Sequence, residues 1–251
     1  MRFLSGPAPV MQVVFERGVI FKRIIDAIKD LSKETNIEIS ENCIDIQAMD
    51  SSHVSLIELN VKNSVKITLD RQQVIAVNFE SVAKILRIME LETPLFISTH
   101  KNRLLFQSGE VQKSEFSTPL MDVEMARHDV PEFDYPNKIT LNSGEFTKIC
   151  SNLKEFGSDI TIQLKNSEVR FIVNGDEANG SLCLSETNTK INIGVELEQT
   201  FAVKHLVAFT KAAPLSDCVD LELGEDFPLR VTFSFQNEDY IRYYLAPKID
   251  E

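Results

Sequence analysis

The sequence predicts an α+β fold in which a few helices pack on antiparallel sheet. Three observations support this: most of the chain alternates apolar and polar residues in short runs, four segments change to helical periodicity, and these segments recur at a nearly constant offset. Alternation with a period of two is typical of antiparallel strands with one wet face. Helices separated by several such runs favour helices on one sheet face over a parallel arrangement.

The strand pattern is clearest in residues 43–46, 160–164, 191–193 and 229–235. Helical periodicity covers residues 18–31, 80–90, 143–156 and 203–213. In the first helical segment one apolar stripe contains Phe21, Ile24, Ile25, Ile28 and Leu31. Before the third, Asn142 or Ser143 can cap the helix, and Glu145 follows in its first turn.

The chain is predicted to be an internal duplication. The helical segments that begin at residues 18 and 143 are 125 positions apart, and those that begin at 80 and 203 are 123 apart. Each half would hold two helices and eight or nine strands. The boundary is expected within residues 118–136, which are charged and contain three prolines.

Composition indicates a globular protein. The 251 residues are 43% hydrophobic and 25% charged, which is near the average for soluble domains. No apolar run approaches the roughly 20 residues of a membrane helix, and two prolines in residues 1–10 argue against a signal peptide, so no membrane or secretory role is expected. Cys43, Cys150, Cys183 and Cys218 form no CxxC pair, which favours reduced thiols in cytosol or nucleus.

Charge is distributed unevenly along the chain. The net charge of −12 argues against a protein that coats DNA by bulk attraction. The 50 residues of the helical segments nevertheless carry nine Lys/Arg against six Asp/Glu, whereas the other 201 carry 17 against 32. A charged face on one helix is usually only solvated. Four such helices in an acidic chain make contact with DNA an equal alternative.

Catalytic motifs are weak. Asp50-Ser51-Ser52-His53 superficially suggests a nucleophile and base, but neighbours in an extended segment point to opposite faces. Residues 175–181 have the glycine spacing of a P-loop without its lysine, so a hairpin turn is the plain interpretation. No His, Cys and carboxylate cluster has zinc spacing. We therefore expect no enzymatic activity, no metal and no cofactor.

Two segments carry a resemblance to a known family. They are MDSSHVSL at residues 49–56 and YYLAPKI at residues 243–249, and weaker matches connect them from about Met11 to Ile249. The chain resembles the proliferating cell nuclear antigen (PCNA) family, the eukaryotic sliding clamps. The resemblance implies a DNA clamp fold with two similar domains, each with two helices packed on antiparallel sheet, and assembly as a six-domain homotrimeric ring. It also implies a role in DNA replication, repair and translesion synthesis in the nucleus.

The resemblance divides the chain at specific positions. Residues 1–10 have no counterpart in the family and form an N-terminal extension. An N-terminal clamp domain at 11–117, an interdomain connector at 118–136 and a C-terminal clamp domain at 137–251 follow. Edge strands expected at 109–117 and 175–184 would pair between neighbouring subunits and close the ring.

The resemblance also implies two sets of site residues. The helices would face double-stranded DNA and contact its phosphates without reading sequence, through Lys22, Arg23, Lys29, Lys84, Arg87, Lys148, Lys204 and Lys211. A pocket for the PIP-box peptides of DNA polymerases, flap endonuclease, DNA ligase and other partners would be lined by Met49, His53, Val54, Leu56, Val130, Pro131, Tyr135, Pro228, Tyr244, Leu245, Ala246 and Pro247. Loading would need a separate ATP-dependent clamp loader.

The chain departs from the family pattern in places. Arg127-His128-Asp129 makes the connector more polar, and Ser151 and Glu155 stand where basic residues are common. Asn166 occupies the position of the ubiquitin-acceptor lysine with Lys165 beside it, so use of Lys165 as acceptor stays open. The alternative is a subunit of a heterotrimeric checkpoint clamp with the same fold. A monomeric viral processivity factor should be basic overall, unlike this chain.

Overall fold

The computed structural model describes residues 11–122, 127–184 and 189–248, and the expected N-terminal extension at 1–10 lies outside them. The chain forms two compact units that are not contiguous in sequence. Unit 1 contains the described residues of 1–48, 58–128 and 235–240, and unit 2 contains those of 49–57, 129–234 and 241–251. Among the described residues, no helix has the length and apolar character needed to cross a membrane.

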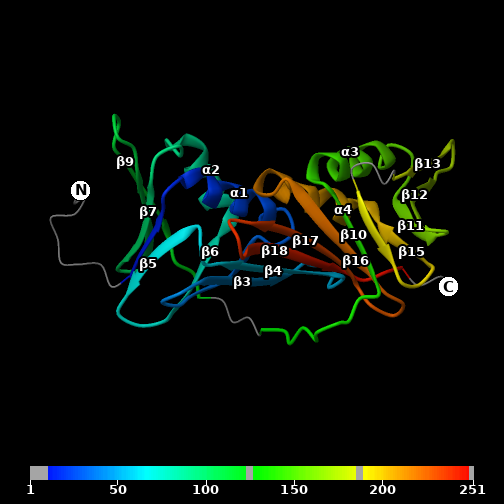
Figure 1. The fold of residues 1–251 in the computed structure, drawn as a ribbon. Coiled ribbons are helices and arrows are strands. Elements are labelled where there is room, and N and C mark those ends of the chain that lie inside the picture. The colour runs from blue at the N-terminus through cyan, green and yellow to red at the C-terminus, as the bar shows by residue number, and fades with distance from the viewer. Residues whose placement is uncertain (1–10, 123–126, 185–188, 249–251) are drawn as a thin grey trace. The chain divides into compact units, whose positions relative to one another are not determined.

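The order of elements confirms the predicted duplication (Figure 1). In the described residues each half runs strand, helix, five strands, helix, three strands. Helices α1 and α3 begin 125 residues apart, and α2 and α4 begin 124 apart. The first half comprises β1 (Met11–Phe15), α1 (Gly18–Ile28), β2 (Glu34–Ile39), β3 (Ile44–Met49), β4 (Ser55–Val61), β5 (Val65–Leu69), β6 (Gln73–Asn78), α2 (Phe79–Ile88), β7 (Leu95–His100), β8 (Arg103–Ser108) and β9 (Ser114–Pro119). The second comprises β10 (Asn137–Asn142), α3 (Ser143–Leu153), β11 (Asp159–Lys165), β12 (Glu168–Asn174), β13 (Asn179–Cys183), β14 (Lys190–Ile193), β15 (Leu197–Ala202), α4 (Val203–Phe209), the 3₁₀ helix η1 (Thr210–Leu215), β16 (Cys218–Leu223), β17 (Leu229–Phe235) and β18 (Asp239–Leu245).

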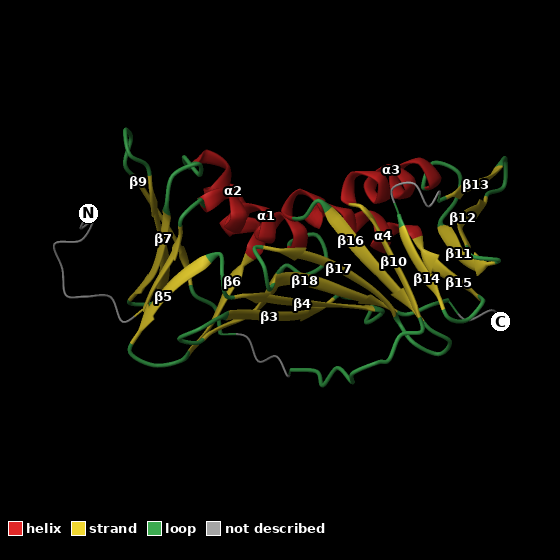
Figure 2. Ribbon diagram, viewed as in Figure 1, coloured by secondary structure: helices red, strands yellow, loops and turns green. Residues whose placement is uncertain are grey.

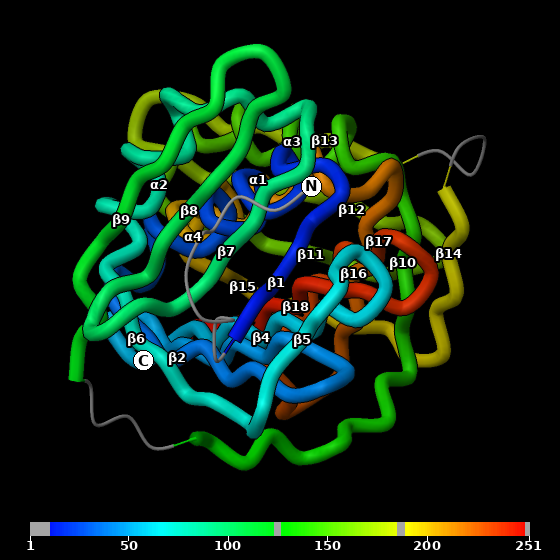
Figure 3. Tube along the Cα trace, turned by 90° about the vertical axis from the view of Figure 1, so that its left-hand side faces the viewer, coloured from blue at the N-terminus to red at the C-terminus, as the bar shows by residue number. Residues whose placement is uncertain are grey.

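Unit 1 contains a five-stranded antiparallel sheet in the order β5-β1-β7-β8-β9, which Figure 3 shows face on. Strand β2 pairs with β3 and β6. Helices α1 and α2 pack against each other and lie on one side of the strands (Figure 2). The ring of Phe21 on α1 packs between Phe15 on β1, at 5.1 Å, and Phe106 on β8, at 6.4 Å. These contacts fix α1 on the five-stranded sheet.

The predicted apolar stripe of α1 is confirmed over most of its length. Phe21, Ile24, Ile25 and Ile28 are buried, but the helix ends at Ile28, so the half-buried Leu31 belongs to the following turn. The polar face of the helix, which carries Lys22 and Lys29, is left toward solvent.

Unit 2 contains the four-stranded antiparallel sheet β13-β12-β11-β15, and β10 pairs with β14 and β16. Helix α3 buries Phe146, Ile149, Cys150 and Leu153. Its N-cap is Asn142, whose side-chain oxygen accepts hydrogen bonds from the backbone N–H groups of Gly144 and Glu145. This side-chain oxygen satisfies two donors of the first turn that lack a partner within the helix.

The fourth helical segment differs from the prediction. The α-helix ends at Phe209, and a 3₁₀ helix with Pro214 inside it continues to Leu215. Proline has no N–H to donate and disfavours an α conformation in the residue before it, which accounts for the tighter geometry. The ring of Phe209 stacks on that of Tyr243 at 4.4 Å and ties the end of α4 to β18.

Asp239, at the start of β18, organises a hairpin far away in the sequence. Its buried carboxylate accepts hydrogen bonds from the backbone N–H groups of Lys62 and Asn63, each at 2.7 Å, and of Ser64 at 2.8 Å. These residues form the turn between β4 and β5, and all belong to unit 1. The turn therefore needs a carboxylate supplied from more than 170 residues later.

The hairpin expected at 175–181 is shorter than that interval. The turn is closed by the N–H of Gly175, which donates to the carbonyl of Ala178, and β13 already begins at Asn179. An ideal Cβ on Gly175 would lie 1.8 Å from the carbonyl oxygen of Phe156, so only glycine allows this approach. Asn166 and Ser167 form another tight turn in left-handed conformation, with φ of 51° and 62°, and exposed Lys165 ends the preceding strand.

Candidate functional site

The basic residues proposed to face DNA lie on the helices, but they are not equivalent. In unit 1, Lys22, Arg23 and Lys29 of the α1 segment are half-buried, and Lys84 and Arg87 of α2 are exposed. In unit 2 the exposed ones are Lys148 on α3, Lys204 on α4 and Lys211, which lies on the 3₁₀ helix. The structure thus gives five of the eight to unit 1 and three to unit 2.

Two of these lysines share one carboxylate. Lys22 donates to Asp26 at 2.6 Å, and Lys29 donates to the other carboxylate oxygen at 2.5 Å. Partial burial raises the pKa of Asp26, but the hydrogen bonds from Lys22 and Lys29 outweigh it and hold that pKa below its ordinary value. Asp26 is therefore ionised at neutral pH.

The loop after β3 is built around Asp50. One oxygen of its buried carboxylate accepts from the backbone N–H of Val54 at 3.0 Å and of Ser55 at 2.7 Å, and the other accepts from the N–H of Ser52 at 3.0 Å and from the Ser52 hydroxyl. Burial raises the pKa of Asp50, but the hydrogen bonds from Ser52, Ser55 and Val54 prevail and lower it to about 2. The charged carboxylate fixes the loop from residue 50 to 55.

This loop presents His53 and Val54 at the surface. His53 adopts a left-handed φ of 57°, and its Nδ1 lies 3.1 Å from the Met49 sulfur. The Val54 side chain is 39% exposed, whereas Leu56, at the start of β4, is buried. The Ser52 hydroxyl points to Asp50 and not to His53, so these groups do not form a nucleophile and base pair.

The second segment that carries the resemblance, described over residues 243–248, is more buried than its sequence suggests. Tyr243 lies in the core, Tyr244 is buried, and Leu245 is only 1% exposed, while Ala246 is exposed and Pro247 half-buried. The Ala246 N–H donates to the Val54 carbonyl at 3.0 Å, and the Lys248 N–H donates to Thr200 on β15 at 2.8 Å. The structure thus joins the loop at 50–55 to the C-terminal segment within unit 2. It keeps the Leu245 side chain away from the surface.

The connector residues of the proposed pocket belong to an aromatic cluster. Tyr135 and Phe133 pack on Phe227, with ring centroids 5.6 and 5.0 Å away, and the Tyr135 hydroxyl donates to the Pro228 carbonyl at 2.8 Å. The Arg230 guanidinium lies 4.5 Å from the Tyr135 ring centre and is held by Glu222. Val130 is half-buried and Pro131 exposed beside this cluster in sequence.

Polar connector residues have defined partners within unit 1. Arg127 pairs with Glu38 at 3.0 Å. The Gln47 side-chain amide donates to the His128 carbonyl at 2.8 Å and accepts from the His128 N–H at 2.6 Å. The polar residues 127 and 128 therefore have polar partners on β2 and β3.

Sequence reasoning missed several residues that shape these regions. Asp50, Phe133 and Phe227 contribute to the structure of the proposed partner site, although none of them is among the pocket residues that the family resemblance implies. His205, on α4, is buried with no hydrogen-bond partner for its Nε2 among the described residues. Burial lowers the pKa of His205, Asp50 opposes that effect, and Lys204 adds to it. An aspartate directly before a Ser-Ser pair was a usable loop signal, whereas nothing in the sequence marks the position of His205.

The two expected edge strands stand at sheet edges. Strand β9 ends the five-stranded sheet of unit 1, and β13 ends the four-stranded sheet of unit 2. Both are shorter than expected, since residues 109–113 form a turn with Gly109 at φ 104° and residues 175–178 form the other turn. Beside β13 is an apolar hollow of about 460 Å³ whose lining includes Phe156, 48% exposed, and Leu182, 37% exposed.

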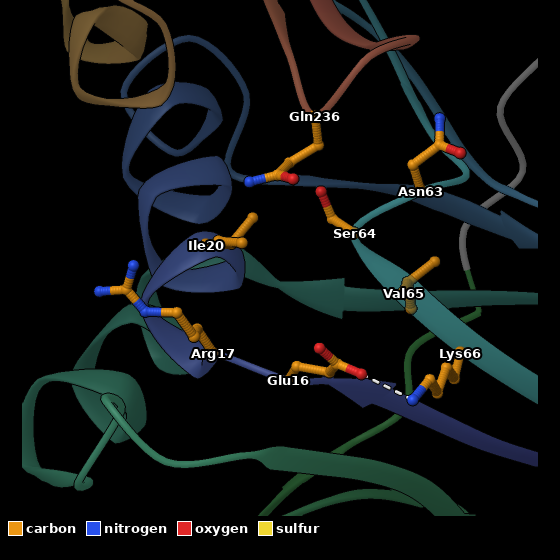
Figure 4. Close-up of a pocket in the computed structure, with 8 residues that line it drawn as sticks. All are labelled: Glu16, Arg17, Ile20, Asn63, Ser64, Val65, Lys66 and Gln236. Carbon is orange, nitrogen blue, oxygen red and sulfur yellow. Dashed lines mark hydrogen bonds and ion pairs between the residues drawn. The ribbon is translucent and has the colours of Figure 1, made fainter.

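A polar hollow of about 190 Å³ lies in unit 1, between the start of α1 and the turn after β4 (Figure 4). Its lining residues are Glu16, Arg17, Ile20, Asn63, Ser64, Val65, Lys66 and Gln236. Glu16 pairs with Lys66 at 2.6 Å, and Arg17 pairs with Glu92 at 2.7 Å. Because its charged groups are already paired, this hollow has no unbalanced charge for a ligand.

The described residues contain no group of three or more His, Cys, Asp or Glu side chains placed to hold a metal ion. All four cysteines are free, and Cys150 is buried. The carboxylates described above are engaged in holding backbone turns or neighbouring lysines.

Comparison with known proteins identifies the family. The family model for the PCNA N-terminal domain matches residues 10–129, and that for the C-terminal domain matches residues 129–248. The proliferating cell nuclear antigen of Chaetomium thermophilum is 35% identical over 257 residues, which covers 96% of this chain and 99% of that protein. The helices and antiparallel sheets agree with the two-domain clamp fold. The chain therefore belongs to the proliferating cell nuclear antigen family of non-enzymatic DNA sliding clamps.

Proposed function

We propose that this protein closes as a homotrimeric ring around double-stranded DNA and tethers replication and repair proteins to it. The observation that carries the proposal is family membership over the whole described chain, together with basic residues on helices of an otherwise acidic protein. Two sheet edges, β9 and β13, support closure by strand pairing between subunits, since an edge strand offers unpaired backbone groups to a partner.

In the proposed complex the helices face the duplex. Lys84, Arg87, Lys148 and Lys204 are exposed and would contact phosphates, which positions a protein without reading sequence. Each exposed pair would contribute less than about 1 kcal/mol. Closure of the ring would keep the protein on DNA while these weak contacts allow it to slide.

The partner site would be the surface around the loop at 50–55, the connector at 130–135 and Ala246-Pro247. Exposed Val54 and Pro131 supply apolar surface, and the backbone N–H of Ala246, which follows the buried Tyr244 and Leu245, bonds to the Val54 carbonyl. An apolar surface fixed by backbone hydrogen bonds suits the aliphatic and aromatic anchors of a short PIP-box peptide. DNA polymerases, flap endonuclease and DNA ligase are the proposed classes of partner.

Val54→Ser is expected to weaken PIP-box peptide binding about tenfold, because the substitution removes an apolar contact of similar size to a buried valine. Isothermal titration calorimetry with an unlabelled synthetic PIP-box peptide measures the change in affinity. Val195→Ser is the matched control, since Val195 is 49% exposed in unit 2 and lies outside the proposed site. Equal peptide affinity in both variants would contradict the site assignment. Leu245→Ala is a poorer test, because truncating a fully buried leucine costs about 2–5 kcal/mol of stability.

The mass in solution tests the proposal directly. Light scattering on a sizing column should give about 85 kDa, three times the subunit mass of 28.4 kDa, at micromolar protein. A species of 28.4 kDa at every concentration would overturn the self-closing ring. Such a monomer would favour the alternative of a heterotrimeric checkpoint-clamp subunit, which the family matches do not favour.

The remaining assignments follow from this function. The expected domains at 11–117 and 137–251, joined by a connector at 118–136, stay a proposal, as do nuclear localisation and a role in translesion synthesis. Opening and loading the ring would need a separate ATP-dependent clamp loader. The family is non-enzymatic, so this energy would come from another protein.

A further inference from the structure

Helix α1 differs from the other basic helices in how its lysines are held. Lys22 and Lys29 lie about two turns apart on the same side of the α1 segment, and Asp26 lies between them, about one turn from each. The carboxylate uses one oxygen for each ammonium group, at 2.6 and 2.5 Å, and all three side chains are partly buried. The three residues, here called the α1 triad, carry a net charge of +1 instead of +2.

Four basic residues on the other helices lack such a carboxylate. Among the described residues, Lys84 and Arg87 on α2, Lys148 on α3 and Lys204 on α4 have no ion-pair partner, and all four are exposed. The nearest counterpart, the pair between Glu80 and Lys33, involves a lysine outside the proposed DNA set. Internal neutralisation therefore distinguishes Lys22 and Lys29 of the α1 segment from these four residues.

We propose that Asp26 limits the strength with which the ring holds DNA, by occupying the two α1 lysines that would otherwise pair with phosphates. The proposal rests on the proposed function, since it requires α1 to face the duplex. A phosphate that approaches Lys22 or Lys29 must compete with a carboxylate already in contact and meets its negative charge. In a trimer the three α1 triads would carry +3, whereas the same six lysines without Asp26 would carry +6.

Asp26→Asn tests the proposal with little change in side-chain shape. Binding of the assembled ring to a short, labelled linear duplex is measured by fluorescence anisotropy at several KCl concentrations. The variant should bind about fivefold tighter at low salt, and its plot of log K against log [KCl] should steepen by about 0.9 for each added phosphate contact. Asp26→Ser gives a second neutral side chain in case the first variant assembles poorly.

Glu16→Gln is the matched control. It removes the same charge and releases Lys66 from a 2.6 Å ion pair, but Glu16 lies in the bend between β1 and α1 and Lys66 lies on β5, so neither residue is on a helix (Figure 4). Its affinity and salt dependence should stay close to those of the unchanged protein. If Asp26→Asn and Glu16→Gln behave alike, overall charge explains the effect and the proposal is overturned.

A double-mutant cycle with Lys29→Gln measures the coupling. Removing the Lys29 charge should cost little DNA affinity when Asp26 is present and several-fold more in the Asp26→Asn protein. The double variant Lys84→Gln with Arg87→Gln tests the proposed DNA face separately from the role of Asp26. If that pair leaves binding unchanged, the proposed DNA face is wrong; if it weakens binding while Asp26→Asn has no effect, only the role of Asp26 is wrong.

Discussion

Leu182→Asp is expected to convert an assembly of about 85 kDa into subunits of 28.4 kDa at micromolar concentration. Leu182 lies on the edge strand β13, is 37% exposed, and lines the apolar hollow together with Phe156. Covering this edge with a second subunit would bury the new carboxylate without a partner, which costs several kcal/mol. Such a cost corresponds to at least a hundredfold weaker association. Light scattering at several protein concentrations measures it.

The matched control for this variant is Val195→Asp. Val195 is 49% exposed in the same unit but lies between β14 and β15, away from β13. It should keep the full mass and the same thermal midpoint as the unchanged protein. An assembly of about 85 kDa that persists in Leu182→Asp would show that β13 is not a subunit contact. A far-ultraviolet circular dichroism spectrum verifies that each variant is folded.

Asp50→Ala is expected to have the largest effect on partner binding of any single substitution in the loop. It leaves the N–H groups of Ser52, Val54 and Ser55 without their acceptor, and the loop loses the arrangement that presents His53 and Val54. We expect a loss of about 2–4 kcal/mol in stability and at least tenfold in PIP-box peptide affinity. Denaturant unfolding at fixed protein concentration and calorimetric titration measure the two effects.

Asp50→Asn and Ser52→Ala distinguish the charge from the shape of the loop. The asparagine oxygen can still accept from Val54 and Ser55, but its amide group faces the N–H of Ser52, so this variant should fall between Asp50→Ala and the unchanged protein. Ser52→Ala removes only the hydroxyl contact and should have the smallest effect. Peptide affinity unchanged in Asp50→Ala would exclude the loop from partner binding.

The stability that the Asp50 carboxylate contributes should depend on pH in the acid range. Because the pKa of Asp50 is lowered to about 2 in the folded protein, its contribution of about 2 kcal/mol is fully present above the unfolded pKa of about 4. That contribution is lost as pH falls from 4 towards 2. The stability difference between the unchanged protein and Asp50→Asn should therefore shrink between pH 4 and pH 2, and a constant difference would contradict the assignment.

Much of the fold could be predicted because it depends on local periodicity. The α1 stripe from Phe21 to Ile28 and the alternation in β11 and β17 each arise from side chains that repeat on one face. The cap at Asn142 was predictable for the same local reason, since its side chain bonds to N–H groups two and three residues later. The repeated spacing of helices then gave the duplication.

The rest depends on contacts between residues distant in sequence. Tyr243 and Leu245 look like surface residues in a short polar and apolar mixture, yet Phe209 and Phe233 enclose Tyr243. The resemblance implied that Lys22 and Lys29 contact DNA, but it did not indicate that Asp26, one turn away, holds both ammonium groups. The family resemblance supplied residue roles, whereas the roles of Asp50 and Phe227 required the folded structure.

The hydrogen bonds of Asp239 affect when unit 1 can complete its folding during synthesis on the ribosome. Unit 1 includes the turn at Lys62–Ser64, but its acceptor and the rest of residues 235–240 emerge only when synthesis is nearly complete. Domains usually fold as they emerge, starting from the N-terminus. Here the turn at Lys62–Ser64 must wait for its acceptor until the last strand arrives. A nascent chain stalled before residue 235 therefore holds an unfinished first unit, and truncation near the C-terminus damages the N-terminal half as well as the C-terminal one.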